Sequence, residues 1–475
     1  MFENVLGQPA SLALISDIET GVLARAMLFQ GPPASGKGTA ALELGRVISC
    51  EAGYDKPGVS GTSAIAGKAD WNCSCPACSR HRLLLHSDLL CLGPKSFSAE
   101  IAASAGTFIR EALAPRETLA PREASKEATG PGRILFIRSV RKLLARFNPV
   151  LWEDDSRGAK VLPMANSLEE SLNELASIKT SAMEESSLKK LADGIIKDAY
   201  KLESEGMSDT IPIGQLRRAA YWSRLAPEGR GKLLIIENAD RMQDEARNSL
   251  LKLLEEPPAR LHCVLASSRP GSLLPTIISR LRPYSFHSRG SAIEAEVIRR
   301  IFKDKAAAGA DESGKTGISA YLDSFLPVKG AVLESLAAFF AASVAYKAIL
   351  LSKKQGRPIP EKAVLLGKYA SPKAEAAGFG RPKGEAGELI AIIIAKAENF
   401  EVHSLFSRFL EYILEHVSMS QKAETASSLL PGPLYNEMWL KNVNWAGRAV
   451  LTYRLRPAQV LEKLFTDLGR GMAGL

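Results

Sequence analysis

A short apolar run followed by polar residues and an amphipathic helix constrains the fold of this chain most strongly. The run is Leu233–Ile236, which is too short for a helix and predicts a buried strand. Glu237 and Asn238 follow directly, so polar side chains lie at the carboxyl end of that strand, where open α/β sheets bind ligands. The next residues carry a leucine-rich face until Pro257-Pro258 ends the helix. We therefore expect a parallel α/β sheet with a ligand site at its carboxyl edge.

A second strand-to-helix junction, near the N-terminus, predicts a phosphate-binding loop. Residues 26–29 predict a strand, a glycine-containing loop follows, and residues 40–44 have helical spacing. Backbone N–H groups and the helix N-terminus would hold phosphates there, and Lys37 would reach the outer ones. The usual pattern places Ser or Thr directly after the lysine to hold magnesium, but Gly38 stands there and Thr39 follows one place late. The predicted nucleotide-binding residues are Gly31, Gly36, Lys37, Gly38, Thr39 and, on the later strand, Glu237.

Two alternatives remain open for this loop. Some nucleotide kinases carry the same Gly-Lys-Gly-Thr sequence, so the chain could be a kinase. The loop could also be purely structural and bind no nucleotide.

Clustered cysteines predict a metal site. Cys75 and Cys78 form a C-x-x-C pair, Cys73 precedes them, and Cys50 could close the site from the end of a helix. Thiolates at such spacing bind zinc tetrahedrally, and this clustering in a long chain favours metal in a reducing cytoplasm over a disulfide framework. The alternatives are buried free thiols and, less favoured, a redox pair.

The composition is that of a soluble globular protein with room for about three domains. Of its 475 residues, 46% are hydrophobic and 24% are charged. The N-terminus lacks the features of a signal peptide, and the apolar tract from Ser335 to Tyr346 predicts a buried core helix, so we expect a cytoplasmic protein with no membrane partner. The net charge of +9 fits an ordinary basic protein or one with a nucleic-acid partner.

Several phrases resemble those of one known family. Asn248–Pro258 is close to the family's most distinctive phrase, N-S-L-L-K-x-L-E-E-P, and Leu273–Leu281 resembles its L-P-T-I-x-S-R-C phrase. Ile211–Arg217 resembles the helix start before its second nucleotide strand. The chain is thus similar to the bacterial DNA polymerase III clamp-loader AAA+ family over residues 2–92 and 211–286, and more weakly in its last third. The resemblance implies an α/β AAA+ nucleotide-binding domain of the P-loop type with a zinc module, a small helical lid and a C-terminal all-α collar.

The resemblance also divides the chain into domains. The AAA+ core is expected at residues 1–288, with the zinc module at 50–91 and an insertion atypical of the family at about 97–209. We expect the insertion to form a few helices packed on the side of the core domain. The helical lid is expected at 289–370 and the collar at 371–475.

In the zinc module, the spacing departs from the family's. The family has one distant cysteine and then C-x-x-C-x-x-C. Here the gap after Cys50 is longer than in the family, and only one residue, Ser74, separates Cys73 from Cys75 where the family has two. Either Cys73 still reaches the metal, or a substitute does; the candidate substitutes are His81, His86 and Cys91.

Two other departures bear on catalysis. Active ATPases of this family have Asp-Glu where the chain has Glu237-Asn238, so the carboxylate that would orient the attacking water is an amide. Gly38 replaces the hydroxyl residue that holds magnesium. Both favour the delta-prime branch, a stator that completes a ring of five; ATP could bind there without being hydrolysed. The alternative is a gamma/tau-like motor subunit with relaxed motifs, which would hydrolyse ATP.

Resemblance also assigns a role to Arg280, which lies in the phrase Leu273–Leu281. In the family this arginine is a finger that enters the nucleotide site of a neighbouring subunit in trans; the alternative is a solvent-facing arginine. Ser267 or Ser268 falls where the family has its first sensor. The implied partners are other clamp-loader subunits (gamma/tau and delta), the sliding clamp and primer-template DNA during replication.

Within the insertion, the tract from Glu111 to Gly132 is rich in Pro, Ala and charge and lacks aromatic residues, which predicts a flexible segment. Limited proteolysis should therefore cut first at its arginines, and deletion of the tract should leave assembly with partner subunits intact. Loss of assembly on deletion would instead show that the tract carries an interface.

Overall fold

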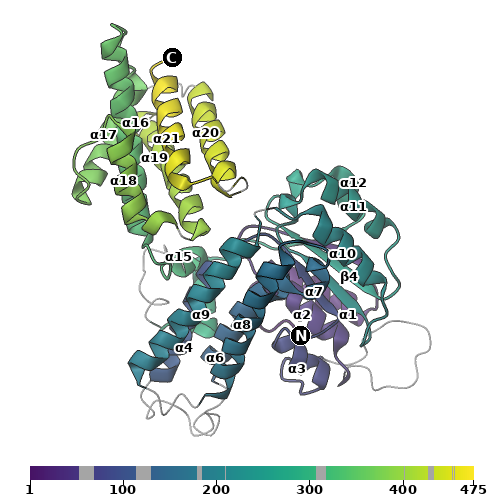
Figure 1. Cartoon of the computed structure of the whole chain (residues 1–475). Coiled ribbons are helices and arrows are strands. Elements are labelled where there is room, and N and C mark those ends of the chain that lie inside the picture. Colours follow the sequence, from purple (N-terminus) through teal and green to yellow (C-terminus); the bar gives the residue numbers. More distant parts are fainter. Residues whose placement is uncertain are drawn as a thin grey trace. The chain divides into compact units, whose positions relative to one another are not determined.

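The structure is a computed structural model, and it divides into two compact units, Met1–Leu322 and Asp323–Leu475 (Figure 1). The finer division into core, lid and collar remains a prediction. The predicted flexible tract lies largely outside the described residues: α4 includes Glu111, and α6 begins at Pro131. The structure describes residues 1–52, 69–113, 130–178, 184–208, 210–305, 317–400, 402–425, 433–451, 453 and 455–474.

Five parallel strands form the sheet of the first unit, in the order β2-β3-β4-β1-β5. The predicted parallel α/β architecture is confirmed. Because all the strands are parallel, their carboxyl ends meet at one edge, and the loop after β1, Glu237 after β3 and Ser268 after β4 gather there. The strands are β1 (Ala26–Gln30), β2 (Leu89–Leu92), β3 (Lys232–Ile236), β4 (Leu261–Ser267) and β5 (Arg282–Ser285).

Each face of this sheet is covered, because alternate side chains of every inner strand point to opposite faces and nearly all are apolar. Phe29 and Ile235 lie in a cluster with residues of α1 (Pro9–Glu19) and α2 (Lys37–Ser49). Leu28 and Leu234 lie in the other cluster, which contains the helices between β2 and β4. The first unit is therefore a three-layer sandwich.

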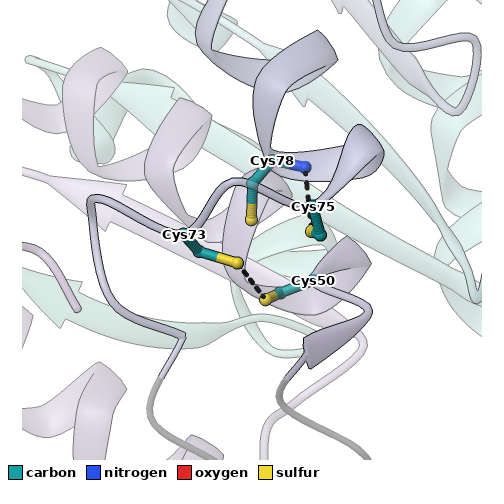
Figure 2. Close-up of side chains that lie close together, drawn as sticks. All are labelled: Cys50, Cys73, Cys75 and Cys78. Atoms are coloured by element: carbon teal, nitrogen blue, oxygen red, sulfur yellow. Dashed lines mark hydrogen bonds between the residues drawn. The ribbon is translucent and has the colours of Figure 1, made fainter.

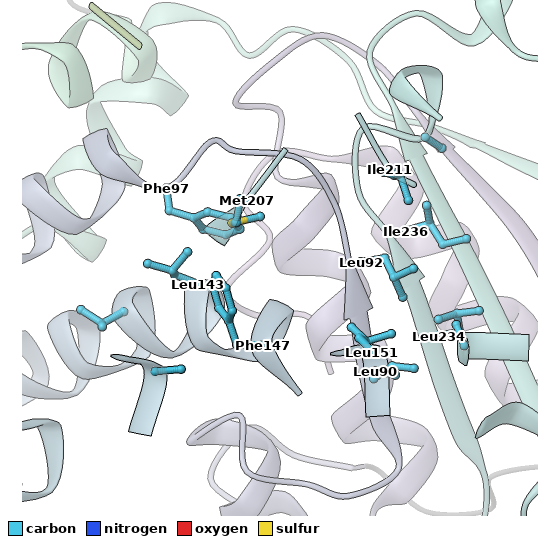
Figure 3. Close-up of a cluster of buried hydrophobic side chains, with 14 of the residues drawn as sticks. Leu90, Leu92, Phe97, Leu143, Phe147, Leu151, Met207, Ile211, Leu234 and Ile236 are labelled. Carbon is cyan, nitrogen blue, oxygen red and sulfur yellow. The ribbon is translucent and has the colours of Figure 1, made fainter. Parts of the chain in front are cut away.

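Helices of the predicted insertion supply much of the helical layer, here called the second layer, on the sheet face that carries Leu28 and Leu234. Figure 3 shows Leu151 beside Leu90 of β2, with Leu234 of β3 close by, and Phe147 beside Leu143 in the same cluster. We expected the insertion at the side of the core; instead it covers a sheet face, because its apolar stripe is continuous with the sheet's own. Its elements are α4 (Ser98–Leu113), α6 (Pro131–Leu144), η3 (Ala145–Phe147), α7 (Pro149–Trp152), α8 (Gly158–Ser177) and α9 (Glu185–Gly206).

The other helices of this unit follow the predicted order. The helix predicted after Asn238 is α11, and the phrase that contains Arg280 begins just before α12. These helices are α3 (Pro76–Arg82), α10 (Ile213–Arg224), η5 (Ala239–Arg241), α11 (Asp244–Glu255), η6 (Pro270–Ser272), α12 (Pro275–Ile278), α13 (Ser291–Ile301) and, across the unit boundary, α15 (Ile318–Asp323).

In its described residues, the second unit is helical. Residues Leu336 to Ala345 of α16 are buried, which confirms the predicted core helix. By length and composition α16 could cross a membrane, but 67% of its apolar window is buried within the protein, as in the core helix of a soluble bundle. The elements are α16 (Gly330–Lys354), α17 (Glu361–Ala376), α18 (Ala386–Lys396), η7 (Glu398–Phe400), α19 (His403–Thr425), α20 (Pro433–Leu451) and α21 (Pro457–Met472).

Candidate functional site

The predicted phosphate loop joins β1 to α2 at the carboxyl edge of the sheet. Gly36 caps α2 with φ of 94°, a left-handed conformation that glycine adopts without strain. The Lys37 ammonium donates to the carbonyl oxygens of Gly31 at 2.7 Å and Pro32 at 2.5 Å. Burial lowers the pKa of Lys37 to about 8, although the carboxylates of Glu237 and Asp240 act in the opposite direction. The lysine is therefore folded back onto its own loop.

Gly38, which stands where the clamp-loader family has a hydroxyl residue, lies against Glu237 at the end of β3. A Cβ atom on Gly38 would lie 2.6 Å from Oε1 of Glu237, too close for any side chain unless the carboxylate moved. A carboxylate oxygen of Glu237 therefore lies where Gly38 lacks a side chain, and Gly38 supplies no hydroxyl to hold magnesium. Thr39, the next residue, is only partly buried.

The other oxygen of Glu237 is held by an arginine from the insertion. Arg146 of η3 donates from Nη2 to Glu237 Oε2 at 2.5 Å, and the Arg146 side chain is only 5% exposed. An ion pair this buried is costly to break, because separation would leave an uncompensated charge. Oε2 of Glu237 is therefore already paired with a cation from within the chain.

Polar groups at the ends of β3 and β4 complete this edge. Ser268 Oγ accepts from Lys37 Nζ at 3.3 Å, whereas the buried Ser267 donates to Asp240 Oδ1 at 2.6 Å. Of the two serines left open by the sequence, Ser268 is the one facing the loop. Asn238 has φ of 49° and ψ of 49°, a left-handed turn that asparagine tolerates.

Arg280 lies directly after α12 and away from this edge, on the surface. Its side chain is 35% exposed, pairs with Glu255 of α11 at 2.8 Å and donates to the Thr276 carbonyl at 2.7 Å. An exposed pair of this kind contributes only about 0–1 kcal/mol, so the guanidinium can leave Glu255 at little cost.

The four predicted cysteine ligands come together at the far end of α2. Sγ atoms of Cys50, Cys73, Cys75 and Cys78 all lie within 4.8 Å of one another (Figure 2). The Cys50 and Cys73 sulfurs are 3.7 Å apart, close to the separation of about 3.8 Å that follows from tetrahedral Zn–S bonds of ~2.3 Å. The cluster fits a structural metal ion held by four thiolates. It would supply cross-linking rather than catalysis, because a four-thiolate site leaves no open position.

Basic side chains surround this cysteine cluster. Arg46 of α2 is 1% exposed, donates to Cys78 Sγ at 3.3 Å, and pairs with the buried Glu43 at 2.6 Å. Arg82 of α3 donates to the carbonyls of Trp71 and Cys73. Four thiolates around Zn²⁺ carry a net charge of −2, which these guanidinium groups offset.

None of the three substitute ligands takes part in the cluster. His81 Nε2 lies 2.9 Å from Ser49 Oγ, and the His81 ring stacks on His86 with centroids 4.2 Å apart. Cys91 is buried in β2, where burial raises its pKa to about 11. The tight Cys73-Ser74-Cys75 spacing thus still allows Cys73 to reach the other thiols.

The roles of Arg46 and Arg146 were not predicted from the sequence. Arg46 precedes Cys50 by four residues, a helical spacing that places both on one side of α2, so this signal was present. Arg146 carried no signal, because it lies in a segment without a recognised pattern, far in sequence from Glu237.

Comparison with known proteins bears on the family. Residues 151–289 match the family described as DNA polymerase III, delta subunit. The chain is 34% identical over 123 residues to DNA polymerase III subunit delta' of Pseudomonas aeruginosa, covering 26% of this chain and 38% of that protein. It is 36% identical over 114 residues to subunit delta' of Bacillus subtilis, covering 24% and 34%. The chain is related to bacterial clamp-loader subunits.

The predicted resemblance to the clamp-loader family, close to delta-prime, is therefore confirmed. The gamma/tau subunit of Mycobacterium tuberculosis is also similar, with 30% identity over 89 residues, or 19% of this chain and 15% of that protein. Each match spans less than two-fifths of the clamp-loader relative's length. The family match begins at residue 151, inside the stretch predicted as an insertion.

For this clamp-loader relative, the cysteine geometry yields a test. Protein prepared without added zinc should contain about one equivalent of metal. Cys75→Ser and Cys78→Ser should each lose the metal and lower the melting temperature, because metal binding is coupled to folding. Cys91→Ser is the matched control and should keep the metal. A metal-free wild type, or unchanged melting in both ligand variants, would contradict the assignment.

Proposed function

We propose that this chain is a delta-prime-like stator subunit of a DNA polymerase III clamp loader. It would complete a ring with gamma/tau and delta subunits and help that ATP-driven ring to load the sliding clamp on primer-template DNA in the cytoplasm. The observation that carries this proposal is the state of the catalytic edge: Gly38 offers no magnesium-holding hydroxyl, and Glu237 is paired with Arg146.

Loss of hydrolysis follows from the chemistry of phosphoryl transfer. Catalysis needs a metal ion on the outer phosphates and a group that orients the attacking water. The chain has Gly38 at the position for the first task and Asn238, after β3, at the position for the second, and an amide cannot accept the water's proton as a carboxylate can. Nucleotide could still contact Lys37 and the loop, so binding without turnover is compatible with this role.

The second candidate is a gamma/tau-like motor subunit. It is favoured by the similarity to gamma/tau of Mycobacterium tuberculosis and by the retained Lys37. A nucleotide kinase is less well supported, because Arg280 and its phrase have no role in one.

Arg280 gives the stator an effect on its neighbour. The guanidinium is exposed and weakly held by Glu255, so it is available to enter another subunit's site. The four-cysteine cluster would hold structural zinc and take no part in this chemistry. The net charge of +9 is compatible with a complex that contacts DNA.

The first test is ATP turnover by the purified chain. Phosphate release should stay at background, because the metal-holding and water-orienting groups are absent. Release well above background that Lys37→Ala abolishes would favour the motor subunit instead.

A second test uses the reconstituted complex with gamma/tau, delta and the clamp. Arg280→Ala should leave folding, metal content and assembly intact while slowing ATP turnover and clamp loading. Arginine fingers are worth ~10³- to 10⁵-fold at one site, and the loss for the whole ring should be smaller because other sites are untouched.

Two further variants sharpen this test. Arg280→Lys should rescue only in part, since lysine lacks the planar fork. Arg260→Ala removes another exposed arginine, before β4, and should load clamps normally. Wild-type loading by Arg280→Ala would reject the finger, and failure of the wild-type chain to assemble with these subunits would reject the stator.

A further inference from the structure

Arg146 is delivered to the nucleotide edge by the inserted helices and is fixed there from several directions. Its Nη1 donates to the Lys142 carbonyl at 3.2 Å, and its guanidinium carbon lies 5.1 Å from the centre of the Phe97 ring. The Arg146 carbonyl accepts from Trp152 Nε1 at 2.9 Å, and Trp152 stacks on Phe147 at 5.4 Å. The arginine is therefore held by its own segment, independently of its carboxylate partner.

That segment is in turn bound firmly to the sheet. Phe147 and Leu151 are buried in the cluster that contains Leu90 and Leu234, as Figure 3 shows. The backbone between Arg146 and these anchors is short, so the guanidinium cannot move far while the second layer stays packed. The position of Arg146 is a property of the folded core rather than of a surface loop.

A glycine beside the Arg146–Glu237 ion pair leaves space for the two side chains. A Cβ atom on Gly93, just after β2, would lie 3.2 Å from Glu237 Cβ and 3.6 Å from Arg146 Nε. Glycine at this position lets the arginine and the glutamate approach each other beside the strand end. Gly38 provides the same clearance on the loop side, at Glu237 Oε1.

In phosphate-loop enzymes, the carboxylate at this strand end and the hydroxyl after the lysine together hold the magnesium ion. Here the hydroxyl is absent and the carboxylate already has a cation. We propose that Arg146 takes the place of the divalent cation, so that the site holds no magnesium ion when nucleotide binds. This inference deepens the proposed function, since it explains how a phosphate-loop fold is kept as a non-hydrolysing structural domain.

Electrostatics support the exchange of one cation for the other. Magnesium binds carboxylates only after partial dehydration and with strict octahedral geometry, so it competes poorly for an oxygen in a buried ion pair. Phosphates that reach Lys37 would meet positive charge without any metal. Nucleotide affinity should therefore not depend on magnesium.

The test is a titration of the full chain with fluorescently labelled ADP, in excess Mg²⁺ and in EDTA. Wild-type protein should give the same affinity in both conditions, or no binding in either. Tighter wild-type binding with Mg²⁺, by about tenfold or more, would overturn the proposal and needs no variant.

Arg146→Met removes the cation and keeps an apolar stem beside Phe97. This variant should gain Mg²⁺-dependent ADP binding of at least about tenfold, because Glu237 is then free to engage the metal. Adding Lys37→Ala should abolish the gain, which places it at the phosphate loop. A folded Arg146→Met protein, by circular dichroism and melting, whose ADP affinity stays independent of Mg²⁺ would also overturn the proposal.

Arg141→Met is the matched control. Arg141 lies on α6 of the same insertion and is similarly buried, but it pairs with Glu169 of α8 at 2.6 Å. Its loss should disturb the insertion without opening the site, so ADP affinity should stay independent of Mg²⁺. If Arg141→Met gains the same dependence, loosening of the insertion and not the lost cation would be the cause, which contradicts the proposal.

The outcome can be separated from that of the proposed function. The titration uses the isolated chain and needs no partner subunit, whereas the stator role is tested by assembly and clamp loading. A chain that fails to assemble could still show Mg²⁺-independent binding, and an active stator could still show Mg²⁺-dependent binding.

Discussion

A parallel sheet whose inner strands are apolar on both faces must be covered on both faces, and the first unit is arranged around that requirement. Helices α1 and α2 cover the face that carries Phe29 and Ile235. The opposite face, with Leu28 and Leu234, is covered largely by a segment that the resemblance to clamp loaders did not account for. The segment is therefore part of the core, and its removal would expose a sheet face to water.

The packing of the insertion on this sheet face also places a charged side chain, Arg146, at the carboxyl edge of the sheet. Phe147 is buried in the core cluster that includes strand residues, and this places its neighbour Arg146 beside the carboxyl end of β3. There Arg146 forms an ion pair with Glu237. The packing energy of the layer thus fixes the position of a cation. Two consecutive residues thus serve two purposes: Phe147 helps to cover the sheet, and Arg146 neutralises Glu237 at the predicted nucleotide edge.

The parts of the fold and site that the sequence predicted are those whose cause is local. The strand at residues 26–29 and the strand before Glu237 were predicted because a short apolar run bounded by polar residues is typical of a buried strand, and the four cysteines because few sites other than a metal site need thiols at that spacing. Arg146 could not be predicted, because its partner lies 91 positions away and the contact depends on how the insertion packs. The same holds for the insertion's place over the sheet face rather than at its side.

Helix α2 begins at the predicted phosphate loop and ends at the cysteine cluster, with Lys37 at one end and Cys50 directly after the other. Its thirteen residues make a rod of about 20 Å, and Arg46 ties the far end to Cys78. Helices ordinarily fray at their ends, but a metal ion held by the cysteine cluster would clamp the C-terminus of this one. Occupancy of such a metal site would therefore affect the order of the whole helix, and loss of the metal would make the predicted phosphate loop at the other end more mobile.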